Sequence, residues 1–235
     1  MPRYSPTFAP FKSLVKQFKS SCDGGLSTSF DSIVARIDKF AKISSSVAEH
    51  KGKTPVDTSP LVTELGGDAT AVGENTLAKG TLDAKTVDVG LVTYSVATAS
   101  FTAAASSPLG GAAVASTSSF ANVAGADLVF TFNTHEQLPV SAQANTAYSK
   151  STTTVIAIDF EFWDSLKGPL VIEQTKHTVH ATGKIDLSGN IATFRASLES
   201  KAPNTLVSLD TQVLTLEDTL STVASSAVLG ASDWF

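Results

Sequence analysis

The chain has 235 residues, of which 42% are apolar and 17% charged, and its formal net charge is −5. This length is sufficient for one large β domain or two small ones with an adequate hydrophobic core. The acidic balance argues against a nucleic-acid surface, which needs clustered Lys and Arg, and no run approaches the ~18 apolar residues of a membrane-spanning helix.

The beginning of the chain predicts a short basic helix. Residues 1–22 contain no acidic side chain, and Phe11, Leu14, Val15 and Phe18 recur at helical spacing after a proline. This stretch lacks the apolar core of a cleavable Sec signal peptide. Two alternatives remain open: the helix packs on the rest of the protein, or it is a membrane-surface or targeting element.

A second helix is expected after Gly24-Gly25. Thr28 and Asp31 have the spacing of a helix cap, and the apolar residues that follow share one helical face. These residues are Phe30, Ile33, Val34, Ile37 and Phe40. We therefore assign residues 1–50 to an N-terminal helical arm, 51–60 to a polar linker and 61–235 to an antiparallel β domain with an acidic C-terminal segment.

The β domain is expected to begin with short runs separated by glycines. The runs are 61–65, 75–79, 81–89 and 91–105, and their punctuation is typical of a β-sandwich or barrel. The last run is built mainly of small side chains, which let another sheet or subunit approach closely. Two further strands are expected at 113–122 and 127–133. The polar stretch 135–150 that follows is either an excursion from the sheet or an edge strand around Val140.

Residues 152–198 contain three runs with the two-residue rhythm of strands. The first places Ile156, Ile158 and Phe160 on one face, and the last places Phe194 and Leu198 on one face. A tight hairpin is expected at residues 188–190. Farther on, we expect a strand to about Leu216 and then a helix. The fold class is therefore mainly β: an antiparallel sandwich or jelly roll with an N-terminal helical arm and a C-terminal helix.

The residues that most suggest catalysis are Asp159 and Glu161. The segment 158–162 resembles the catalytic strand of glycoside hydrolase family 16, where alternating acids aim at one sugar. That resemblance implies a hydrolase, but Ala157 stands where the nucleophilic Glu of that family should be. Asp159 and Glu161 are then two acids on the polar face of a strand.

Glu173, His177 and His180 are the residues that most suggest a metal site. On a strand, Glu173 and His177 share a face and His180 points to the other, so these three side chains do not form a compact site. Phosphate-binding and dinucleotide-binding glycine motifs do not occur in the sequence. The sequence therefore predicts no catalytic residue, no cofactor-binding residue and no metal ligand.

Two further resemblances concern assembly and export. The segment 75–85 is similar to a strand-turn-strand segment of the TasA and camelysin family, which implies a secreted jelly roll that polymerises by strand donation. After Lys201 the chain carries only acidic charges and ends on bulky apolar residues. That end resembles the uncleaved export signal of type I secreted bacterial proteins, while an ordinary acidic terminal segment is the alternative.

The sequence thus predicts a non-enzymatic, self-assembling structural protein of a surface, an extracellular fibre or a particle. Its partners would be copies of itself, and its location would be extracellular or at the cell surface without a cleavable signal peptide. One alternative is a secreted module that binds a surface glycan or small ligand in a cleft lined by Trp163, Tyr94 or Tyr148. A glycoside hydrolase-like enzyme that uses Asp159 and Glu161 is the third.

Overall fold

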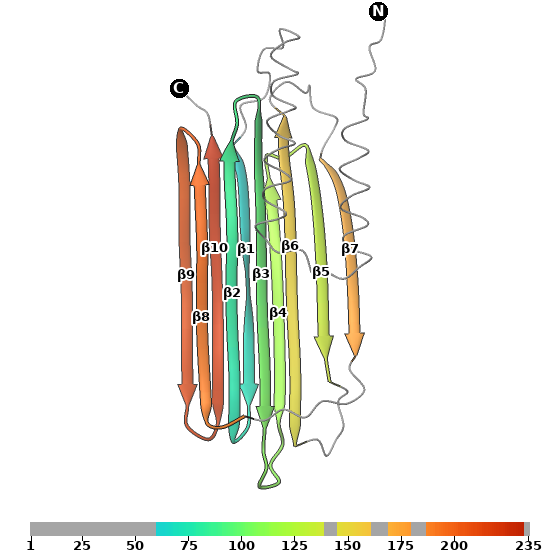
Figure 1. Cartoon of the computed structure of the whole chain (residues 1–235), viewed down its shortest axis with the longest axis vertical. Coiled ribbons are helices and arrows are strands. Elements are labelled where there is room, and N and C mark those ends of the chain that lie inside the picture. Colours follow the sequence, from blue (N-terminus) through green and yellow to red (C-terminus); the bar gives the residue numbers. More distant parts are fainter. Residues whose placement is uncertain (1–59, 139–144, 161–168, 180–186, 233–235) are drawn as a thin grey trace, which may run out of the picture.

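The computed structural model describes residues 60–138, 145–160, 169–179 and 187–232. These residues form long β-strands that run along the long axis of the molecule (Figure 1). The strands are β1 (Leu61–Val72), β2 (Asn75–Asp88), β3 (Val92–Ser106), β4 (Val114–Ala124), β5 (Leu128–Gln137), β6 (Thr146–Phe160), β7 (Leu170–Val179), β8 (Asn190–Lys201), β9 (Asn204–Leu216) and β10 (Leu220–Ser232).

Two sheets pack face to face, which confirms the mainly β, sandwich-like fold. The four-stranded sheet has the order β4-β1-β10-β9, and the six-stranded sheet has the order β7-β5-β6-β3-β2-β8. Strand β4 lies over β6, β1 over β3, β10 over β2 and β9 over β8. The six-stranded sheet therefore extends past the four-stranded one at β5 and β7.

The topology differs from our expectation in two respects. Most neighbouring strands are antiparallel, but β8 pairs parallel to β2 and β7 pairs parallel to β5. The first arm of the hairpin expected at residues 188–190 lies mostly outside the described residues. The division into four and six strands also differs from the eight strands of a jelly roll.

The expected C-terminal helix is a strand. Residues 220–232 form β10, which pairs with β9 across a short turn and with β1 on its other side. Asp218 adopts a positive φ of 53° in this turn, a conformation that Asp tolerates better than most residues. The inward positions of β10 include Ser221 and Ser225, so its two-residue apolar rhythm is weak in the sequence.

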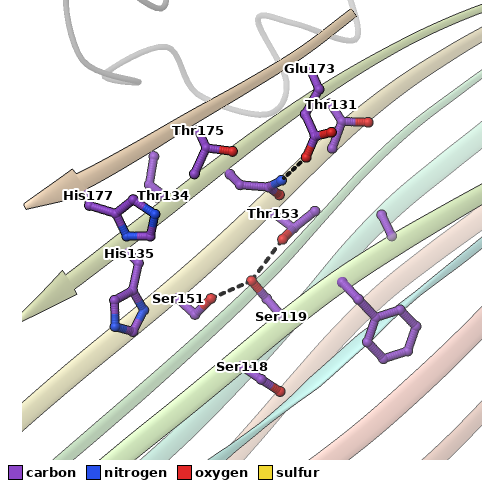
Figure 2. Close-up of a pocket in the computed structure, with 13 residues that line it drawn as sticks. Ser118, Ser119, Thr131, Thr134, His135, Ser151, Thr153, Glu173, Thr175 and His177 are labelled. Carbon is purple, nitrogen blue, oxygen red and sulfur yellow. Dashed lines mark hydrogen bonds between the residues drawn. The ribbon is translucent and has the colours of Figure 1, made fainter. Parts of the chain in front are cut away.

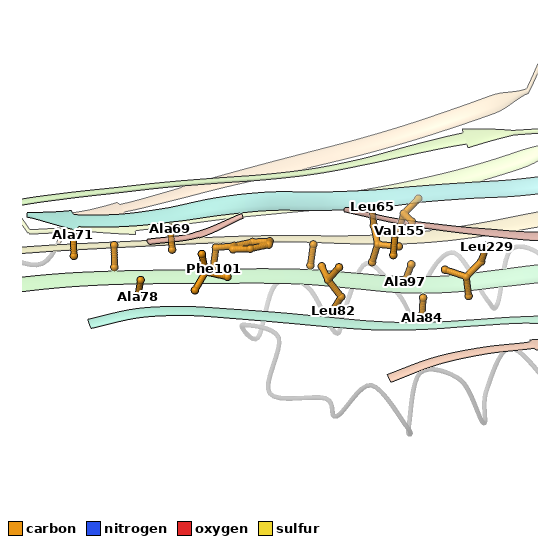
Figure 3. Close-up of a cluster of buried hydrophobic side chains, with 14 of the residues drawn as sticks. Leu65, Ala69, Ala71, Ala78, Leu82, Ala84, Ala97, Phe101, Val155 and Leu229 are labelled. Atoms are coloured by element: carbon orange, nitrogen blue, oxygen red, sulfur yellow. The ribbon is translucent and has the colours of Figure 1, made fainter. Parts of the chain in front are cut away.

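Small side chains fill most of the space between the sheets (Figure 3). More than half of the buried cluster is alanine. The cluster consists of Leu65, Ala69, Ala71, Ala78, Leu82, Ala84, Ala97, Ala99, Phe101, Ala103, Ala105, Val129, Val155, Val223, Ala227 and Leu229. The small volume of alanine lets the two backbones approach closely, and Phe101 is the largest side chain of this buried cluster.

Glycines inside the strands make room for Phe101. A Cβ added at Gly67 of β1 would clash with the backbone carbonyl oxygen of Ser118 on β4 and would lie 2.7 Å from the Phe101 ring, and one added at Gly80 of β2 would lie 2.9 Å from that ring. We expected Gly66-Gly67 and Gly80 to separate strands, and that expectation is wrong. Here glycine is required because the aromatic ring occupies the space of a side chain, not because the chain turns.

Large side chains gather on the opposite face of the six-stranded sheet. Tyr94, Phe130, Ile156 and Ile158 are at most 2% exposed, although they alternate with the residues that face the four-stranded sheet. The six-stranded sheet is therefore buried on both faces along β3, β5 and β6. Antiparallel sheets more commonly have one solvated face.

The helical arm and nearly all of the linker expected at residues 1–60 lie outside the described residues. In the part of the chain that is described, no helix is long and apolar enough to cross a membrane.

The close fit around Phe101 makes a prediction about Gly67. Replacing Gly67 with Ala should lower the free energy of unfolding by about 1–3 kcal/mol, because the added methyl overpacks the interior. Gly230→Ala is the matched control, since its Cβ would meet its nearest neighbour, the Leu206 Cβ, at 3.4 Å. Urea denaturation measures both variants, and equal stabilities would contradict this account of the interior.

Candidate functional site

A polar groove lies where the six-stranded sheet extends past β4 (Figure 2). Its volume is about 470 Å³, and its lining residues come from β4, β5, β6 and β7. The four-stranded sheet ends at β4, so the faces of β5 and β7 beside it lack a covering strand among the described residues. The groove is therefore a direct result of the unequal widths of the two sheets.

Hydroxyl groups join β4 to β6 at one side of the groove. The Ser119 hydroxyl lies 2.7 Å from the Ser151 hydroxyl and 2.8 Å from the Thr153 hydroxyl. On the outer strands, the Asn133 amide donates a hydrogen bond of 3.0 Å to the Glu173 carboxylate. These contacts fix the positions of the polar side chains, as Figure 2 shows.

Two histidines lie side by side in the groove. His135 of β5 and His177 of β7 occupy the same register position, and their ring centroids are 6.0 Å apart in an edge-to-face arrangement. Glu173 and His177 both line the groove, which confirms that they share a face of β7. His180 lies outside the described residues. Among the residues that are described, no group of three or more His, Cys, Asp or Glu is placed to hold a metal ion.

The other residues that the sequence suggested do not meet in this groove. Asp159 is 3% exposed near the end of β6, and Glu161 and Trp163 lie outside the described residues. Tyr94 is fully buried, and Tyr148 does not line the groove. Burial, and secondarily the charge of Glu136, raise the pKa of Tyr148. The described residues thus bring together serines, threonines and histidines rather than the expected aromatic and acidic side chains.

A second candidate site is the outer edge of β9, a strand that pairs only with β10 among the described residues. Six of its apolar side chains are 45–55% exposed. They are Leu206, Val207, Leu209, Val213, Leu214 and Leu216. Because neighbouring residues point to opposite faces of a strand, these side chains make both faces of β9 apolar. In Figure 1, β9 is the outermost strand on one side of the sandwich.

The edges of the six-stranded sheet carry more charge than the β9 edge. On β8, Glu199 lies 3.0 Å from the Lys85 ammonium, and hydrogen bonds from Lys201 and Lys85 lower the pKa of Glu199. Strand β7 carries Glu173 and Lys176. Charged side chains on an edge strand discourage pairing with another chain.

Strand β9 lacks this protection. Its only charged residue is Asp210, and it contains no Lys, Arg or Pro. Strand β4 is also uncharged, but most of its residues are Ser, Thr, Ala or Asn. A long, flat and apolar edge strand is the type of surface that pairs with another strand. Among the four sheet edges described, β9 therefore has the strongest features of an association surface.

The apolar pattern of the sequence around β9 is a feature that indicates an association surface. The apolar residues of 206–223 fit neither the helical nor the strand rhythm cleanly. The structure explains this mixture, because β9 is apolar on both faces, whereas β10 alternates. An apolar run on a strand that has only one neighbour indicates an association surface, but the number of neighbours is known only from the sheet order.

The chain matches no protein-family model, no curated protein and no solved structure.

Proposed function

We propose that this protein is a non-enzymatic, self-assembling structural protein of a surface, an extracellular fibre or a particle. The observation that carries the proposal is the β9 edge, with thirteen residues, apolar side chains on both faces and one charge. Its partner would be a copy of the same chain, joined by β-augmentation, in which strands of two molecules share one sheet.

Pairing at β9 would be stabilised in two ways. An edge strand has backbone N–H and C=O groups that point away from its only neighbour, and a second strand supplies partners for them. Burial of exposed Leu and Val side chains adds about 25 cal/mol for each Å² of apolar surface removed from water. Backbone pairing and apolar burial thus act together at this edge.

The extracellular location is part of the same proposal. It is supported by the weakly charged, Ser- and Thr-rich composition and by the acidic segment after Lys201, which resembles a type I secretion signal. The basic N-terminal arm and the acidic C-terminal segment carry opposite charges, which would favour a head-to-tail contact between subunits. Residues 1–59 and 233–235 lie outside the described residues, whereas β9 is described in full.

Self-association measured by light scattering and electron microscopy tests the proposal. The unmodified protein should form dimers or larger ordered particles as its concentration rises. In the double variant Leu209→Lys/Val213→Lys, association should weaken by about 10- to 100-fold, because like charges oppose pairing and apolar contacts are lost.

The matched control is Val171→Lys/Val179→Lys on β7. These two valines are 56% and 58% exposed on an edge of the other sheet, so the change in charge and apolarity is the same. Their replacement should leave association unchanged. A strictly monomeric protein at high concentration would refute the proposal, as would loss of association in the β7 variant alone.

A second candidate function is the binding of a carbohydrate or another small polar ligand in the groove. The specific observation is the row of Ser, Thr, Asn and His side chains around about 470 Å³ of accessible space. Hydroxyl, amide and imidazole groups can donate and accept hydrogen bonds to a polyhydroxylated ligand. Unlike typical ligand pockets, this groove has few large aromatic side chains: Phe120 is the one Phe, Tyr or Trp among its lining residues.

A glycan array tests this second function. If the groove binds glycans, Asn133→Ala should reduce the signal at least several-fold, because Asn133 lines the groove and bonds Glu173 there. Asn122→Ala is the control, because Asn122 is an exposed residue of β4 that does not line the groove. Absence of binding across the array, or equal loss in both variants, would count against glycan binding.

A further inference from the structure

Strand β9 is close to self-complementary when a second copy is laid beside it in the opposite direction. With Thr211 opposite the partner's Thr211, Leu206 falls opposite the partner's Leu216. In the same alignment, Leu209 falls opposite the partner's Val213. Four of the six exposed apolar side chains of β9 thus meet one another, with one pair on each face of the strand, while Val207 and Leu214 fall opposite the partner's Thr215 and the partner's Ser208.

We infer that two copies of this chain pair antiparallel through β9 about a two-fold axis at Thr211. The two four-stranded sheets then form one continuous sheet across the dimer. This inference rests on the proposed self-assembly and specifies its first contact. A two-fold contact is isologous, which means that the same patch is used on both subunits.

The geometry of antiparallel pairing restricts the possible registers. Residues directly opposite each other lie on the same face of a sheet, so even-numbered residues must meet even-numbered ones and odd must meet odd. The registers that keep at least eleven of the thirteen residues of β9 paired are therefore those centred on Leu209, Asp210 or Thr211. A centre at Leu209 places Leu206 opposite the partner's Gln212 and Val207 opposite the partner's Thr211, which opposes apolar side chains to polar ones.

The charge of Asp210 favours one of the two remaining registers over the other. A centre at Asp210 places the two Asp210 carboxylates directly opposite each other, and like charges in that position destabilise a sheet. A centre at Thr211 instead places Asp210 opposite the partner's Gln212, whose amide can donate a hydrogen bond to the carboxylate. The Thr211 register therefore combines apolar pairing with a favourable polar pair.

Two-fold pairing has a consequence for the order of assembly. In the dimer the β9 edge of each subunit is paired with that of the other. This contact therefore gives a closed dimer and does not by itself extend into a filament. The dimer is then the unit of assembly, and a fibre or particle needs a second contact elsewhere on the subunit.

Disulfide cross-linking tests the register. In a Cys22→Ser background, Thr211→Cys should form a covalent dimer on mild oxidation, because opposite residues have Cα atoms about 4.5–5.5 Å apart, within disulfide range. Val207→Cys is the control. In this register residue 207 lies opposite the partner's residue 215, which is eight residues from the partner's residue 207. At ~3.4 Å per residue the two cysteines lie about 27 Å apart, so no covalent dimer should form.

Mixtures of single-cysteine proteins distinguish the neighbouring register. A mixture of Leu209→Cys and Val213→Cys proteins should give mixed covalent dimers, whereas Val207→Cys with Val213→Cys should not. Circular dichroism and thermal melting confirm that each variant keeps its fold, and light scattering measures association of the unmodified protein.

The possible results separate the inference from the proposed function. If the protein associates and the cysteines at 207 and 213 cross-link, the strands pair in the register centred on Asp210. That result overturns the inference, while self-assembly stands. Association without any of these cross-links overturns the inference, while self-assembly stands. A monomeric protein at all concentrations overturns both the inference and the proposed function.

Discussion

The close approach of the two sheets is the constraint on which the rest of the structure depends. Alanine makes up more than half of the buried cluster between the sheets, and Gly67 and Gly80 leave room for the Phe101 ring. Because these side chains are small, burial must be spread along many residues, and the strands are 10–15 residues long. The result is a long, thin sandwich whose edges are a large part of its surface.

The edges are also where the two candidate sites lie. At one side, β5 and β7 extend past β4 and form the polar groove. At the other side, β9 lies at the end of its sheet with apolar side chains on both faces. Neither site depends on a buried catalytic group. The same architecture that makes a thin sandwich therefore provides one surface for a polar ligand and another for a second copy.

Local sequence patterns predicted the strands much better than their arrangement. The two-residue rhythm identified most of β6 and β8, and small-residue runs identified β3 and β4. Glycines inside strands were mistaken for turns because their cause, contact with Phe101, comes from another strand. The strand β10 was missed because serines occupy inward positions. The groove depends on which strands overlap between sheets, so Glu173 and His177 were placed on one face but His135 was not recognised as their neighbour.

The central claim is that β9 is the surface through which copies of this chain associate. Hydrogen exchange of its backbone amides tests it most directly, because alternate amides of an edge strand point away from their only neighbour. We predict that amides in Asn204–Leu216 become protected as the protein associates with rising concentration, while those in Val114–Ala124 of β4 do not. Association that leaves exchange in β9 unchanged would contradict the claim.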